Sequence, residues 1–137
     1  MRTLSFGRLI YLIYLFTIAV PLLLLITGGS SVLLIIASYA RVPASFISQV
    51  TKFWSWSCLT LTLCRVEVRG REHLPQSDAP CVVVANHQSA YDICALNACI
   101  GIPFKWVMKA ELRRMPLVGR ACEASGFIFV DETRVSS

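Results

Sequence analysis

Residues 81–99, CVVVANHQSAYDICALNAC, predict the class of the fold. The run 81–85 contains three consecutive valines, which is typical of a strand buried on both faces of a parallel sheet. Ser89 and Asp92 then have the S-x-x-D spacing of a capping box, and the apolar run 93–99 continues the helix that this box would open. A buried strand followed at once by a helix indicates an α/β layer architecture.

The segments on either side extend this order of strands and helices. Further strands are predicted at 65–69, 104–108 and 127–130, and short helices at 110–114 and 117–124. We therefore expect residues 65–137 to form an αβ domain. A unit of about 73 residues buries only about 60% of the surface of its unfolded chain, so we expect further chain, a membrane surface or a partner to complete it.

The N-terminal part predicts a membrane anchor over residues 1–42. Residues 9–27 carry no charge and are numerous enough for one helix to cross the hydrocarbon core. A shorter apolar run, 32–40, follows the small residues 28–31. Two arrangements fit: one long helix bent at Pro21, or a helix pair that turns at 28–31. A cleaved signal peptide fits less well, because its apolar region is usually about 7–15 residues long.

Residues 43–64 predict an amphipathic helix at the membrane interface. Its apolar residues recur at helical spacing and form one face: Phe46, Ile47, Val50, Phe53, Trp54 and Leu61. Trp54 and Trp56 lie beside Lys52, a combination that suits the headgroup region. The same pattern also fits a helix that packs against the αβ domain, and the sequence leaves both alternatives open.

Composition and charge support a membrane protein. Apolar residues make up 55% of the 137 residues and charged residues 15%, and the mean hydropathy is +0.63. The net charge of +5 comes from basic residues that flank the apolar block and recur after residue 104. These residues are either ordinary solvated charges or sites of attraction to anionic headgroups. No motif of a nucleic-acid reader occurs, so we expect no nucleic-acid partner.

Six cysteines raise the question of disulfides or a metal. They are Cys58, Cys64, Cys81, Cys94, Cys99 and Cys122. No C-x-x-C occurs, and the two histidines lack metal-ligand spacing, so we expect neither a metal site nor a cofactor. Thiols inside apolar runs behave as small buried hydrophobic groups. Reduced cysteines favour the cytosolic side, so we expect an inner (cytoplasmic) membrane location with the αβ domain facing the cytosol.

His87 and Asp92 are the candidate catalytic pair. His87 follows the predicted buried strand, where α/β sheets commonly place ligands, and an imidazole takes up a proton near neutral pH. The two side chains can meet only if His87 lies in the loop and Asp92 in the first helical turn. Asp92 would then orient the ring, although it could instead only cap the helix, with His87 an ordinary loop residue. Ser89 lacks the G-x-S-x-G context of a nucleophile.

The run 86–92, NHQSAYD, resembles the N-H-x-x-x-x-D block of the glycerophospholipid acyltransferase superfamily, most closely the 1-acyl-glycerol-3-phosphate acyltransferases. Three further stretches resemble family blocks in the expected order: 68–75 (V-x-G-x-E-x-L-P), 109–119 (K-x-E-L…P…G) and 126–131 (the block that usually ends F-I-D-R). The resemblance covers about 65–134 and implies a partial αβ acyltransferase domain behind a membrane-embedded helix or helix pair.

The resemblance also implies a reaction. His87 would remove the proton of the sn-2 hydroxyl of 1-acyl-glycerol-3-phosphate, and Asp92 would hold the ring. The acyl group would come from acyl-CoA or acyl-carrier protein, and the product would be phosphatidic acid in phospholipid biosynthesis. Lys109 and Arg134 are the candidate substrate-binding residues for the phosphate. Membrane lipid and lysophosphatidic acid are the other expected partners.

The sequence departs from the family pattern in two places. Glu132 stands where the family usually has arginine, with Arg134 two positions later. The family's later Phe-Pro-Glu-Gly-Thr block and its fourth block do not occur before residue 137. We therefore expect a truncated product or fragment with little or no turnover of its own. The rival hypotheses are a non-catalytic, membrane-anchored relative and an acyltransferase for another lysolipid.

Overall fold

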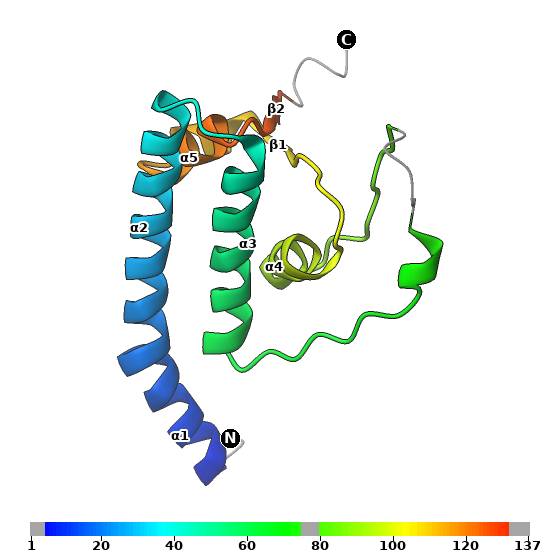
Figure 1. Cartoon of the computed structure of the whole chain (residues 1–137). Helices are drawn as coiled ribbons and strands as arrows, with labels where there is room; N and C mark the ends of the chain where they lie inside the picture. Colours follow the sequence, from blue (N-terminus) through cyan, green and yellow to red (C-terminus); the bar gives the residue numbers. More distant parts are fainter. Residues whose placement is uncertain (1–4, 75–79, 132–137) are drawn as a thin grey trace.

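The computed structural model describes residues 5–74 and 80–131 (Figure 1). Three consecutive segments form one unbroken N-terminal helix: α1 (Phe6–Tyr14), the π-helical turn η1 (Leu15–Ala19) and α2 (Val20–Tyr39). The helix bends where η1 precedes Pro21, which has no backbone N–H to donate (Figure 1). Of the two arrangements that the sequence left open, the structure has the one long helix.

The other arrangement, a helix pair that turns at 28–31, is wrong, because these residues lie inside α2. Ser30 and Ser31 are buried, and burial of this face offsets the weak helix propensity of the glycines. The chain reverses after Tyr39 instead. Arg41 adopts a left-handed conformation with φ 53°, and the N–H of Val42 donates to the Ala37 carbonyl, as in a Schellman motif.

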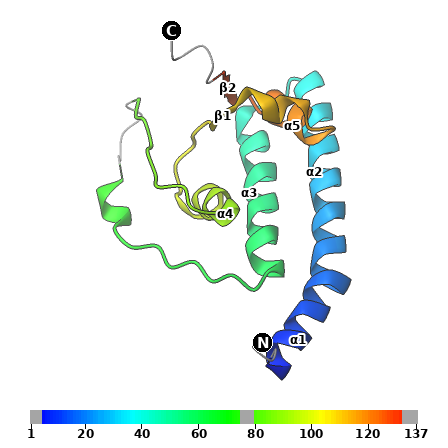
Figure 2. The same ribbon diagram turned by 180° about the vertical axis from the view of Figure 1, so that it is seen from behind.

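Helix α3 (Ala44–Leu61) returns beside α2, and the two views in Figures 1 and 2 agree on this hairpin. Trp54 Nε1 donates to Thr27 Oγ1 at 3.0 Å, which joins the two helices near their middle. The hydroxyls of Tyr11 and Tyr14 donate to the carbonyls of residues 62 and 61, at 3.1 and 3.0 Å. Carbonyls at the end of a helix have no partner within it, so these two bonds cap α3.

Helix α3 also packs against the later helices α5 and α4. Its residue Val50 packs with Leu34 of α2 and Ala121 of α5 (Val118–Ala124). Farther along, Leu59 packs with two buried residues of α4 (Ala90–Cys99). The alternative of a packing helix therefore describes much of α3. The predicted interfacial location of residues 43–64 stays a prediction.

The C-terminal part contains a small parallel sheet. Strand β1 (Val107–Lys109) pairs with β2 (Ile128–Val130), with Val107 opposite Ile128, and the 3-10 turn η3 (Ala110–Arg114) and α5 connect them. A second 3-10 turn, η2, spans Arg71–His73. The predicted helices at 93–99, 110–114 and 117–124 and the strand at 127–130 are confirmed, and the strand predicted at 104–108 is confirmed in part.

The strands predicted at 65–69 and 81–85 are wrong. Both segments are irregular and exposed, and the side chains of Val82 and Val84 are 90% and 89% exposed. Propensity for β structure depends on packing and on a hydrogen-bonded neighbour. Neither segment pairs with β1 or β2, the two strands of the described sheet. The described chain is therefore mostly helical, with a two-stranded sheet in place of the expected α/β layers.

Candidate active site

The predicted capping box is present at the start of α4. Ser89 Oγ accepts from the N–H of Tyr91 at 3.2 Å. Asp92 Oδ2 accepts from the N–H groups of Ser89 and Gln88 at 2.7 and 2.6 Å. Donors that the helix itself cannot satisfy are thus satisfied by a serine and a carboxylate, which is why the helix begins here.

The same carboxylate oxygen faces His87. Nδ1 of His87 lies 3.3 Å from Asp92 Oδ2, and the side chains are 62% and 33% exposed. Asp92 can therefore cap the helix and orient the His87 ring at the same time, because its Oδ2 atom makes both contacts. We call His87 and Asp92 the dyad. The contact at Nδ1 leaves Nε2, on the other side of the exposed ring, available to a second group.

The electrostatics of the dyad keep Asp92 ionised. The backbone N–H of Ser89, with that of Gln88 next, lowers the pKa of Asp92 below its usual value. Desolvation opposes this effect to a smaller extent, and the nearby His87 adds a still smaller lowering. An anionic Asp92 favours the Nδ1–H tautomer of His87. In that tautomer Nε2 carries the lone pair that can accept a proton.

Helix α4 is fixed in position by contacts that the sequence did not predict. Its buried face packs against Leu59 of α3, and Asn97 Nδ2 donates to Ser55 Oγ at 2.8 Å. At its C-terminal end, Arg71 Nη2 donates to the Cys99 carbonyl at 2.8 Å, where a cation also complements the helix dipole. The one available signal was Ser55, a small polar residue inside an apolar helical pattern.

The predicted substrate-binding residues are Lys109 and Arg134. Lys109 ends β1 and is exposed, and Arg134 lies outside the described residues, so both assignments stay predictions. Two neighbouring cations already have structural partners. Lys105 Nζ donates to the Ser125 carbonyl at 2.5 Å, and Arg113 pairs with Glu123 at 2.6 Å.

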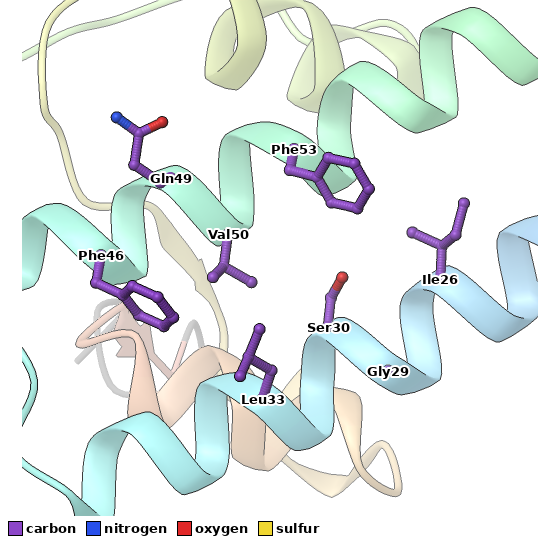
Figure 3. A pocket seen from close by; sticks show the side chains of 8 residues that line it. All are labelled: Ile26, Gly29, Ser30, Leu33, Phe46, Gln49, Val50 and Phe53. Atoms are coloured by element: carbon purple, nitrogen blue, oxygen red, sulfur yellow. The ribbon is translucent and has the colours of Figure 1, made fainter.

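An apolar groove of about 430 Å³ lies between α2 and α3, away from the dyad (Figure 3). It is lined by Ile26, Gly29, Ser30, Leu33, Phe46, Gln49, Val50 and Phe53. Both phenylalanines point toward α2, whereas the amide of Gln49 points away from it (Figure 3). The groove therefore offers almost only apolar surface. Among residues 5–74 and 80–131, no cluster of three or more His, Cys, Asp or Glu could hold a metal ion.

Comparison with known proteins identifies the family. The Acyltransferase family model matches residues 65–136, which is more than half of the chain and includes the dyad. The chain belongs to the acyltransferase family. No solved structure matches it.

The curated relatives of this acyltransferase family member carry one activity name. A chloroplastic 1-acyl-sn-glycerol-3-phosphate acyltransferase, BAT2 of Brassica napus, is 34% identical over 80% of the chain and 30% of its own length. A 1-acyl-sn-glycerol-3-phosphate acyltransferase of Chlamydomonas reinhardtii is 30% identical over 85% of the chain and 33% of its own length. The human 1-acyl-sn-glycerol-3-phosphate acyltransferase alpha is 41% identical over 51% of the chain and 24% of its own length. The chain spans about a third or less of each relative.

Proposed function

We propose that this protein transfers an acyl group from a thioester to the sn-2 hydroxyl of 1-acyl-glycerol-3-phosphate, with His87 as the general base. The hydroxyl hydrogen-bonds to Nε2 of His87, which removes its proton as the oxygen attacks the thioester carbonyl. The tetrahedral intermediate then collapses, the thiolate leaves, and the imidazolium returns the proton to it. Phosphatidic acid and the free thiol are the products.

The observation that carries this proposal is the 3.3 Å approach of Asp92 to His87 within the segment that matches the family. Asp92 holds the reactive tautomer, and its negative charge stabilises the imidazolium that forms during proton transfer. The exposure of the ring supports access by a substrate from outside the fold. The activity for which the relatives are named supports lysophosphatidic acid as the acceptor.

Membrane attachment is the second part of the proposal. The helix Phe6–Tyr39 is the one helix in the described chain that is long and apolar enough to cross a membrane. Residues 6–25 of this helix expose large apolar side chains, among them Phe6, Phe16, Leu24 and Leu25. Water would oppose this exposure, whereas hydrocarbon would solvate it. An anchor of this kind would bring the dyad to the lipid surface, where the acceptor resides.

The test compares three variants of the full-length protein in mixed micelles that contain lysophosphatidic acid and labelled acyl-CoA. Loss of the base in His87→Ala should lower kcat by about 10²–10⁴-fold, the usual contribution of general base catalysis. Asp92→Asn keeps an acceptor for the cap and removes the charge, so kcat should fall while helix content is retained.

Ser89→Ala is the matched control. It removes the Ser89 Oγ cap, at a cost of about 0.5–2 kcal/mol, and leaves the contact between Asp92 and His87 in place. Its kcat should stay close to that of the parent protein. Near-normal turnover by His87→Ala would contradict the role of the base. A parent protein that binds the lipid without turnover would instead favour a truncated product or a non-catalytic relative, and Glu132 also favours the relative. A parallel assay with acyl-carrier protein thioester identifies the donor.

A further inference from the structure

We propose that Cys58 of α3 and Cys94 of α4 form a reversible disulfide site. In this site a small-molecule disulfide converts two packed thiols into a covalent bridge between the helical hairpin (residues 6–61) and α4, the helix that carries Asp92 of the dyad. The proposal does not depend on the acyl-transfer activity.

The two cysteines meet at the contact between α3 and α4. Cys94 is buried in the cluster that it forms with Leu59 and Ala98, and Cys58 packs against the same cluster from α3. The two side chains shift each other's pKa, as expected for neighbours in this cluster. Both cysteines are free, so the structure shows the reduced state of the pair.

A polar contact fixes the register that keeps these thiols opposite each other. Asn97 Nδ2 donates to Ser55 Oγ at 2.8 Å, and Ser55 is fully buried. Ser55 lies three residues before Cys58, and Asn97 lies three residues after Cys94, so each contact is about one helical turn from the other. Small side chains at all of these positions let the two helices approach closely. A disulfide requires such an approach, since its Cβ atoms lie about 3.5–4.5 Å apart.

The difference in burial between the two thiols determines which of them reacts first. Cys58 is partly exposed and can meet a reagent from solution, whereas Cys94 is buried. Contact with the Cys94 side chain lowers the pKa of Cys58, and the same contact together with burial raises the pKa of Cys94. Cys58 is therefore the attacking thiol and Cys94 the resolving thiol.

The reaction is a thiol–disulfide exchange with a glutathione-type disulfide. The Cys58 thiolate attacks one sulfur of the reagent and displaces the first small thiol, which takes up the proton that Cys58 lost. Cys94 then attacks the Cys58 sulfur of the mixed disulfide and displaces the second small thiol, again with transfer of the proton. Two protein S–H bonds and one reagent S–S bond are broken. One protein S–S bond and two reagent S–H bonds form, so the protein is oxidised by two electrons and the reagent is reduced.

The experiment treats the full chain, purified in detergent, with oxidised glutathione and maps its peptides without reduction. The expected product has lost two hydrogen atoms in intact mass and joins the peptide of Cys58 to that of Cys94. Dithiothreitol should reverse the bridge. Hydrogen exchange at the backbone of α4 should slow in the oxidised form, because the helix is then tethered to α3.

Substitutions separate this site from the other cysteines. Cys94→Ser should leave Cys58 as a stable mixed disulfide with glutathione, and Cys94→Ala gives the same test if the serine variant fails to fold. Cys122→Ser, which changes a cysteine on α5, should keep the bridge. Cys99→Ser should also keep it, although Cys99 packs against the same cluster. Oxidised parent protein that retains glutathione at Cys58 without a bridge, or that links Cys58 to Cys99, would overturn the proposal.

Discussion

Replacement of Gly119 by alanine tests how closely α5 packs on the turn before it. Gly119 is buried near the start of α5, and its N–H donates to the Met115 carbonyl. A Cβ atom at this position would lie 2.7 Å from the carbonyl carbon of Arg113 and 2.8 Å from the Leu112 carbonyl oxygen, and nearer still to the Arg113 oxygen. Side-chain rotation cannot relieve these contacts, because every obstructing atom belongs to the backbone of η3.

Two effects of opposite sign determine how Gly119→Ala changes the free energy of unfolding. Alanine is favoured over glycine in a helix by at most about 1 kcal/mol. Forcing extra atoms into a packed site costs about 1–3 kcal/mol, and the upper part of this range applies where backbone must move. The steric cost therefore exceeds the propensity gain, and Gly119→Ala should lower the free energy of unfolding by about 1–2 kcal/mol. The shift of η3 should also weaken the ion pair of Arg113 with Glu123.

Gly28→Ala is the matched control. A Cβ at Gly28, in the interior of α2, would have no neighbour within 4 Å. The same substitution should there raise stability by up to about 1 kcal/mol, since only the propensity term remains. Urea unfolding in one detergent, followed by far-UV circular dichroism, compares the two variants with the parent. Equal or greater stability of Gly119→Ala than of the parent protein would refute the packing argument.

Three further substitutions test other contacts. Ser55→Ala removes the acceptor of Asn97 at a fully buried position, so the free energy of unfolding in urea should fall by about 1–3 kcal/mol. A fall below the error of the measurement would show that this bond does not hold α4. Trp54→Phe and Thr27→Val should each cost about 0.5–1.5 kcal/mol, and a double-mutant cycle without coupling would rule out the bond between α2 and α3. The folded-state pKa of Asp92 lies below its unfolded value, so its stabilisation of α4 should be complete above about pH 4 and lost as pH falls through the folded pKa. Hydrogen exchange of α4 in acid should show this loss in the parent protein and not in Asp92→Asn.

Several features could be predicted from the sequence because the interactions behind them are local. The N-terminal helix follows from an uncharged apolar run, and the start of α4 follows from Ser89 and Asp92, which lie three residues apart. The contact of Asp92 with His87 follows from the same cap, since His87 must precede the helix for the two to meet. Interactions within one helical turn need no information about the rest of the fold.

Other features depended on residues that are distant in the sequence. The run 81–85 has the composition of a buried strand, yet it is exposed, because a strand also needs a neighbour to complete its hydrogen bonds. The chain reverses after Tyr39 rather than at Gly28, since burial of this part of α2 against α3 and α5 favours a continuous helix.

The sequence by itself determined most of the helical segments, the position of the dyad before and within the first turn of α4, and which family the blocks resemble, because periodicity, capping and motif spacing act over a few residues. Only the tertiary structure decided that α3 lies between α2 and α4, that Ser55 holds Asn97, and that Cys58 faces Cys94. Ser55 and Asn97 are 42 positions apart in the sequence, and Cys58 and Cys94 are 36 apart. Such pairs meet only when whole helices pack, and no local pattern encodes the partner.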